Sequence, residues 1–159
     1  HAPTLLFLDE PTSAVDPENR RDFWEKLFDL SDAGTTILVS THYMDEAERC
    51  HQLAILETGR LRNQGTPAEL LAQLDGRVVE VAGDDLRQTK ERLLRLPQVQ
   101  SAAQQGTHLR VLLTPGVENP LAALQQHVTH SNATIALTRP SLEDVFVAST
   151  STTPPDFGP

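Results

Sequence analysis

Short apolar runs bounded by turn residues mark the strands that this sequence predicts. The first run covers residues 5–8 and leads directly into Asp9, Glu10 and Pro11. A run this short is typical of a strand buried on both faces of a parallel sheet. A second run at residues 36–39 predicts a companion strand over residues 35–40.

Between the two runs, the sequence predicts a helix over residues 17–31. Asp16 is a good N-cap, and Pro17 suits the first helical position. The residues expected on the apolar face are Phe23, Trp24, Leu27, Phe28 and Leu30. A shorter helix is expected over residues 43–50, with three acidic residues on its exposed side: Asp45, Glu46 and Glu48.

Residues 53–74 predict a hairpin followed by a helix. The strands are expected over residues 53–56 and 61–64, and Thr66 is expected to cap a helix over residues 67–74. From residue 77 the pattern changes to the order β-α-β-β-α-β, which is that of the ferredoxin-like split motif. Its strands are expected over residues 78–81, 99–104, 107–113 and 134–137, and its helices over residues 84–96 and 118–130.

The end of the chain predicts one more helix, over residues 141–147. Residues 149–159 consist mainly of Ser, Thr and Pro with almost no apolar content. Such a composition cannot bury enough apolar surface to fold, so we expect a disordered tail.

Candidate chemistry lies directly after the first strand. In open α/β sheets, functional residues collect just beyond the carboxyl ends of the strands, where Asp9 and Glu10 are expected. One carboxylate there can hold Mg²⁺, directly or through water, and the next can take a proton from an attacking water. This pairing suits nucleotide hydrolysis.

Composition narrows the classes of partner. The 159 residues include 13 Lys and Arg against 22 Asp and Glu, which gives a net charge of −9. A nucleic-acid-binding protein needs a basic surface, so we expect no nucleic-acid partner. A nucleotide is not excluded, because a helix N-terminus or Mg²⁺ can supply local positive charge.

The cysteine content and the hydropathy indicate in which cellular compartment the protein is expected. The single cysteine, Cys50, excludes an internal disulfide and fits a reducing compartment. No apolar run approaches the roughly 20 residues that span a bilayer, and no signal peptide is visible. The chain begins with His1 rather than Met, which is typical of a fragment or a processed chain.

Two motifs resemble those of one family. Residues 5–17, Leu-Leu-Phe-Leu-Asp-Glu-Pro-Thr-Ser-Ala-Val-Asp-Pro, closely resemble the Walker B segment and D-loop of ABC-transporter ATPases. Ser40-Thr41-His42 resembles the switch-histidine segment of the same family and follows in the family's order. Residues 139–146, Arg-Pro-Ser-Leu-Glu-Asp-Val-Phe, resemble the end of a small domain found after some drug- and polyketide-type exporter ATPases.

The resemblance implies a role for each site residue. Asp9 matches the Walker B aspartate that holds Mg²⁺, directly or through water, and Glu10 matches the general base that deprotonates the attacking water. His42 matches the histidine that contacts the γ-phosphate. Ser13 and Asp16 match the D-loop, which faces the nucleotide and the partner subunit. For Asp16 the alternative is that it only caps the following helix.

The resemblance also implies a fold class and an assembly. The fold class would be α/β, with a partial P-loop-type parallel sheet followed by a small ferredoxin-like α+β domain. Residues 1–76 would belong to the nucleotide-binding domain and residues 77–148 to the accessory domain. The cofactors would be ATP and Mg²⁺. The partners would be a membrane permease and a second ATPase subunit at the cytoplasmic face of the membrane, where the protein would power export of a small molecule.

Two family motifs are missing from these residues. A P-loop needs Gly-x-x-x-x-Gly-Lys-Ser/Thr, but the only lysines, Lys26 and Lys90, do not follow a glycine. No two of the 8 glycines are adjacent, so the Leu-Ser-Gly-Gly-Gln-type signature is also absent. The resemblance therefore starts at Walker B. We expect negligible ATP binding and turnover by these residues alone, and an unpaired edge and exposed apolar face on the first strand.

Two other hypotheses stay open at this point. The chain could act as a non-catalytic regulatory or dimerisation module, or it could be the remnant of a disrupted gene. An exposed apolar sheet face would favour the module hypothesis. That face would be formed by Val79, Val81, Leu109, Val111 and Leu113.

Overall fold

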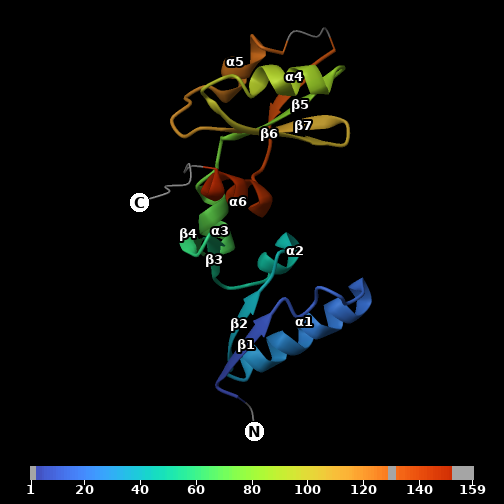
Figure 1. Cartoon of the computed structure of the whole chain (residues 1–159), viewed down its shortest axis with the longest axis vertical. Coiled ribbons are helices and arrows are strands. Elements are labelled where there is room, and N and C mark those ends of the chain that lie inside the picture. The colour runs from blue at the N-terminus through green and yellow to red at the C-terminus, as the bar shows by residue number, and fades with distance from the viewer. Residues whose placement is uncertain (1–2, 129–131, 152–159) are drawn as a thin grey trace. The chain divides into compact units, whose positions relative to one another are not determined.

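A computed structural model describes residues 3–128 and 132–151 (Figure 1). The chain divides into two compact units, His1–Arg49 and Cys50–Pro159. Among the helices of the described residues, none has the length and apolar character that a membrane span requires.

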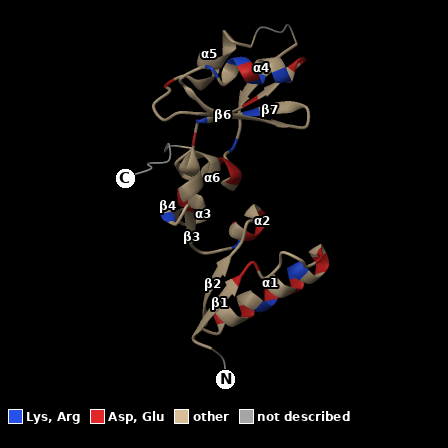
Figure 2. Cartoon of the chain, viewed as in Figure 1, with Lys and Arg blue, Asp and Glu red and all other residues tan. Residues whose placement is uncertain are grey.

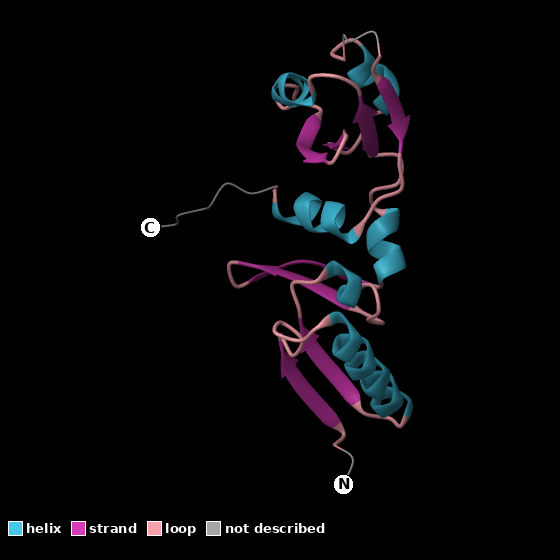
Figure 3. Ribbon diagram, turned by 90° about the vertical axis from the view of Figure 1, so that its right-hand side faces the viewer, coloured by secondary structure: helices cyan, strands magenta, loops and turns pink. Residues whose placement is uncertain are grey.

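The first unit is built on a pair of parallel strands. Strand β1 (Leu5–Asp9) and strand β2 (Thr36–Ser40) place Leu5 opposite Thr36 and Asp9 opposite Ser40. Helix α1 (Pro17–Asp32) connects them and lies along one side of the pair (Figure 3). It begins as predicted, with Pro17 in its first turn and the Asp16 side chain accepting a hydrogen bond from the backbone N–H of Asn19.

Helix α1 presents an apolar stripe to the strands and a charged face to solvent. Trp24 and Leu27 are its buried residues, as the periodicity predicts. Acidic and basic residues are both present along the helix (Figure 2). Arg21 and Glu25, one helical turn apart, lie 3.7 Å from each other there and are mostly exposed. Exposed pairs of this kind contribute little to stability.

The face of the β1–β2 pair that α1 does not cover is exposed to solvent and apolar. Leu5, Phe7 and Leu38 are 49%, 66% and 59% exposed. The prediction that the first strand is buried on both faces is therefore wrong here, because a single helix covers only one side of a two-stranded sheet. The exposed apolar face that the missing P-loop segment led us to expect is confirmed.

Helix α2 (Met44–Ala47) is shorter than the helix predicted over residues 43–50. Asp45 and Glu48 are exposed as predicted, but Glu46 is fully buried. The prediction that Glu46 lies on the exposed side is therefore wrong. The reason is a set of polar contacts with residues distant in sequence, which are described below.

The second unit starts with a hairpin and a capped helix. Strands β3 (Leu53–Glu57) and β4 (Arg60–Gly65) are antiparallel. Helix α3 (Pro67–Ala72) begins with a capping box, in which Thr66 and Glu69 exchange hydrogen bonds with each other's backbone. Helix α6 (Leu142–Thr150) packs against α3 and the hairpin. It continues beyond the predicted end at residue 147, and residues 152–159 of the predicted tail lie outside the described residues.

A four-stranded antiparallel sheet forms the rest of the second unit. Its order is β6-β7-β5-β8, and the elements follow the chain as β-α-β-β-α-β. The strands are β5 (Val78–Ala82), β6 (Val99–Gln105), β7 (His108–Leu113) and β8 (Thr134–Leu137). Helices α4 (Leu86–Leu93) and α5 (Pro120–Gln125) lie over one face (Figure 1). Helix α5 is shorter than predicted over residues 118–130, of which 129 and 130 lie outside the described residues.

The main hydrophobic core lies between this sheet and the two helices. Leu93 of α4 and Leu124 of α5 are fully buried against the strands. The sheet residues that they cover are at most 1% exposed: Val79, Val81, Leu109, Val111 and Leu113. The exposed apolar face that would have favoured a dimerisation module is therefore not present on these strands.

Candidate functional site

The ends of β1 and β2 lie side by side because the strands are parallel and Asp9 pairs with Ser40. The Ser40 hydroxyl donates a hydrogen bond to Oδ1 of Asp9 and accepts one, 3.0 Å long, from the backbone N–H of Glu10. The Ser40 carbonyl accepts from the same N–H at 3.1 Å. The last residue of β2 thus holds both carboxylate-bearing residues at the end of β1.

Glu10 and His42 lie close together at this edge. The imidazole Nδ1 of His42 is 3.3 Å from Oε1 of Glu10, and the two side chains are 57% and 51% exposed. The backbone of Glu10 turns sharply after the strand, with a φ of +41°. Two residues predicted to act on the same phosphate therefore meet, in a position that a solvent-borne ligand can reach.

Asp9 offers a suitable ligand for a hard cation, but not a complete site. Its Oδ1 is engaged by Ser40, and its carboxylate lies at the exposed strand end. Within residues 3–128 and 132–151, no group of three or more His, Cys, Asp or Glu side chains is arranged to hold a metal ion. The single Asp9 carboxylate is nevertheless suitable for Mg²⁺, because Mg²⁺ commonly takes one or two carboxylates together with waters and substrate phosphates.

The loop between β1 and α1 contains the other two predicted residues. The backbone N–H of Ser13 donates to the Glu10 carbonyl at 3.2 Å, and the Ser13 side chain is exposed. Asp16 accepts from the backbone and side chain of Asn19, at 3.1 and 2.6 Å. Hydrogen bonds from the Asn19 side chain and backbone hold the pKa of Asp16 below its usual range. The capping role of Asp16 is thus observed, and its D-loop role stays a prediction.

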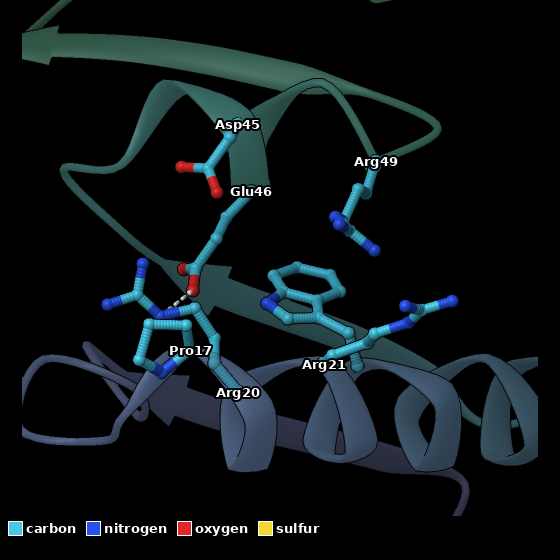
Figure 4. A pocket seen from close by; sticks show the side chains of 7 residues that line it. Pro17, Arg20, Arg21, Asp45, Glu46 and Arg49 are labelled. Carbon is cyan, nitrogen blue, oxygen red and sulfur yellow. Dashed lines mark ion pairs between the residues drawn. The ribbon is translucent and has the colours of Figure 1, made fainter.

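A buried carboxylate lies beneath this edge, and the sequence did not predict it. Glu46 Oε1 accepts a 2.6 Å hydrogen bond from Thr12, and Oε2 accepts a 2.7 Å bond from Thr41. Arg20 of α1 places its Nε 3.6 Å from Oε1 (Figure 4). Burial by itself raises the pKa of Glu46, but the two threonines, the nearby Trp24 indole and Arg20 together hold that pKa below its usual value.

Arg20 also contacts the segment that carries His42. Its guanidinium carbon lies 4.2 Å from the centre of the Tyr43 ring, within the range of a cation–π contact. The Tyr43 and His42 rings have centroids 4.2 Å apart and an interplanar angle of 35°. The Tyr43 backbone N–H donates to the Thr41 hydroxyl at 3.0 Å. Polar and ring contacts therefore run continuously from α1 to the imidazole.

The chain has relatives among curated proteins, although no family model matches it. It is 49% identical over 73 residues to the probable multidrug ABC transporter ATP-binding protein YbhF of Escherichia coli K12, covering 46% of this chain and 13% of that protein. It is 40% identical over 151 residues to the Nod factor export ATP-binding protein I of Ralstonia nicotianae, covering 91% of this chain and 46% of that protein. The protein of the same name from Rhizobium leguminosarum bv. viciae is 40% identical over 147 residues, covering 91% and 45%.

These relatives confirm the resemblance inferred from the motifs. The match to the Ralstonia protein extends over both units, because it covers 91% of the chain. The chain spans less than half the length of each of these curated relatives.

Proposed function

This chain is homologous to ABC transporter ATP-binding proteins, and from that relationship we propose that it is the C-terminal part of the ATP-hydrolysing subunit of an exporter. The observation that carries the proposal is the Glu10–His42 pair, 3.3 Å apart at the shared end of two parallel strands. Residues 1–76 would complete a nucleotide-binding domain, and residues 77–148 would form a ferredoxin-like accessory domain. The observed strand order and the β-α-β-β-α-β sequence of elements support the second assignment.

Each residue of the pair would have a separate task in phosphoryl transfer. Glu10 would orient the attacking water through one carboxylate oxygen and accept its proton. His42 turns Nδ1 toward Glu10, which can only accept a hydrogen bond, so Nε2 would donate to an oxygen of the γ-phosphate when both ring nitrogens carry a proton. Positioning dominates such reactions, so the short distance between the two side chains matters more than a perturbed pKa.

Asp9 would hold Mg²⁺ beside this pair, directly or through a water. When bound, Mg²⁺ supplies charge neutralisation at the phosphate oxygens. Ser40 fixes the orientation of the Asp9 carboxylate by donating to Oδ1. Ser13 and Asp16 would lie in the D-loop that faces a second ATPase subunit and its nucleotide.

The bare face of the β1–β2 pair supports the proposal that further chain belongs here. Leu5, Phe7 and Leu38 are exposed, whereas the residues that alternate with them along β1 and β2 include partly buried apolar side chains. Figure 3 shows α1 along one side of the strand pair. In the intact subunit, the segment carrying the P-loop would cover this face and supply the phosphate cradle. Two such subunits would drive a membrane permease from the cytoplasmic side and export a small molecule, as the export and multidrug names of the relatives suggest.

Calorimetric titration with Mg-ATP tests the proposal. The 159-residue chain should show no binding, whereas a chain extended N-terminally to include the P-loop should bind. In the extended chain, Glu10→Gln should retain ATP affinity and lower kcat by about 10²–10⁴-fold, the range of a lost general base. Glu18→Gln, an exposed acid in the first turn of α1, is the matched control. Full activity of Glu10→Gln, or no ATP binding by the extended chain, would overturn the proposal.

A further inference from the structure

We propose that Glu46 is a positioning residue for Glu10 and His42, because its buried carboxylate ties the loop after β1 to the loop after β2. The catalytic consequence of this link rests on the proposed function, whereas the link itself is a property of the fold. Glu46 contacts neither Glu10 nor His42 in the described hydrogen bonds and ion pairs, so it would act through their neighbours.

Each oxygen of Glu46 serves a different loop. Oε1 accepts from Thr12, which lies two residues after Glu10 and is 1% exposed. Oε2 accepts from Thr41, which directly precedes His42. One carboxylate therefore fixes both backbones within two residues of the side chains that form the candidate site.

A second route leads from Glu46 to the imidazole itself. Arg20 is placed 3.6 Å from Oε1 and stacks over Tyr43, whose ring lies against that of His42. Helix α1 carries Arg20. The Glu46 carboxylate therefore contacts the helix, the loop before it and the segment that carries His42. Figure 4 shows Glu46 pointing from α2 toward α1, with Arg20 directed at its carboxylate.

The chemistry of these contacts explains why a carboxylate occupies this position. Two hydroxyl donors approach two separate oxygens, and an ionised carboxylate accepts at both. A glutamine would offer one acceptor oxygen, so one threonine would lose its acceptor. Stability alone does not require a buried ion here, since apolar residues often replace such groups without loss. A fully satisfied buried network instead gives a rigid, specific geometry.

Loss of the link should therefore alter turnover more than nucleotide binding. Misplacing a reacting group by about 1 Å can cost on the order of 10²-fold in rate. ATP affinity would be set mainly by the phosphate cradle of the P-loop, which is not among these residues. The inference thus predicts a change in kcat without a matching change in KM.

Thr12→Val is the sharpest variant, because valine keeps the shape of threonine and removes only the hydroxyl that reaches Glu46. In the N-terminally extended chain, we expect kcat to fall about tenfold or more with KM within about twofold. Thr12→Ser restores the hydroxyl and should restore kcat. Thr35→Val is the matched control, since Thr35 is also buried and donates one 2.8 Å hydrogen bond, to the Pro3 carbonyl at the opposite end of the strands.

A second measurement does not depend on ATP. In the 159-residue chain, Thr12→Val should shift the backbone amide resonances of residues 41–43, and this shift should vanish when Glu46→Met, which removes both acceptor oxygens, is already present. If the extended chain fails to bind ATP, the proposed function fails and these resonances still decide whether the link exists. An unchanged resonance pattern at residues 41–43 would overturn the inference. In an extended chain that hydrolyses ATP, the inference would also be overturned if Thr12→Val left kcat unchanged, or if Thr35→Val lowered kcat as much as Thr12→Val does.

Discussion

Arg110 on β7 holds the Asp144 carboxylate of α6 through two nitrogens. Its Nε lies 2.9 Å from Oδ1, and its Nη2 lies 2.6 Å from Oδ2. Arg110 and Asp144 are only 14% and 9% exposed, and Asp144 also closes the capping box of α6 with Ser141. The hydrogen bonds that Arg110 donates to Asp144 raise the pKa of Arg110 further above its already high value. This pair therefore fastens α6 to the face of the sheet opposite α4 and α5.

Asp144→Asn should destabilise the second unit. Asparagine retains the shape and one acceptor oxygen but loses the charge, which leaves Arg110 without its ionic partner. We expect the free energy of unfolding to fall by about 1.5–3 kcal/mol, the range for hydrogen bonds to charged groups. Urea unfolding followed by far-UV circular dichroism measures the change. Glu143→Gln, the exposed neighbour, should leave the midpoint almost unchanged, and an equal loss in both variants would contradict this account.

The depressed pKa of Glu46 gives the first unit a defined pH dependence. Burial opposes ionisation, but Thr12, Thr41, Trp24 and Arg20 together favour it more strongly, so the folded pKa lies below the ordinary value of 4.5. Well above that value the carboxylate is ionised in both the folded and the unfolded chain, and the stabilisation is fully present. Below about pH 5 the unfolded chain takes up the proton first, so stability is lost as pH falls.

Trp24 fluorescence measures this effect, because Trp24 is the only tryptophan and is buried in the first unit. Urea midpoints should fall on acidification from pH 6 to pH 3, and Glu46→Gln should flatten that fall. Asp45→Asn removes an exposed neighbouring carboxylate and should retain the slope. A slope that persists unchanged in Glu46→Gln would assign the pH dependence to other groups.

Capping and subunit contact can be separated at Asp16. Asparagine caps helices as well as aspartate does, whereas alanine does not. Thermal unfolding of the 159-residue chain should therefore show a lowered midpoint for Asp16→Ala and little change for Asp16→Asn. In the extended chain, a loss of ATPase activity in Asp16→Asn would indicate a D-loop role for the charge. Normal activity in Asp16→Asn would leave capping as its function.

The bare apolar face of the first unit should be detectable with a hydrophobic dye. Exposed apolar strands at a sheet edge promote association between chains. We expect Phe7→Thr combined with Leu38→Thr to lower the fluorescence of 8-anilinonaphthalene-1-sulfonate and to reduce self-association in sedimentation velocity. Leu94→Thr is the control, since Leu94 is 46% exposed on the second unit and lies outside this face. An equal effect of Leu94→Thr would show that dye binding and self-association do not depend on this face.

Features set by neighbours in sequence could be predicted. The cap at Asp16-Pro17 and the capping box of Thr66 and Glu69 involve partners three positions apart, so short motifs reveal them. The placement of Asp9 and Glu10 at the end of the strand also followed from a general rule about open α/β sheets. His42, which lies beside Glu10, was singled out by the family resemblance. Their chemical roles are supported by the geometry and remain predictions.

Features set by distant partners could not be predicted. Glu46 is buried because Thr12, 34 positions earlier, donates to it, and a helical pattern assigns a charged residue to solvent by default. The alternation in β5 and β7 shows that Val79 and Val111 share a face but not what covers it. Helices α4 and α5 cover that face, so the exposed surface that would have favoured the module hypothesis is not found on these strands.

The left-handed backbone at Glu10 makes the stability of the fold and the proposed hydrolysis place opposite demands on one residue. A residue with a side chain adopts a φ of +41° at a cost of about 1–2 kcal/mol, whereas glycine adopts it freely and asparagine does so readily. The substitutions that relax this turn also remove the carboxylate proposed to act as the base. Screens for thermostable variants would therefore favour replacements at this position that abolish the proposed activity, and a glutamate retained there would be a sign of selection for that activity.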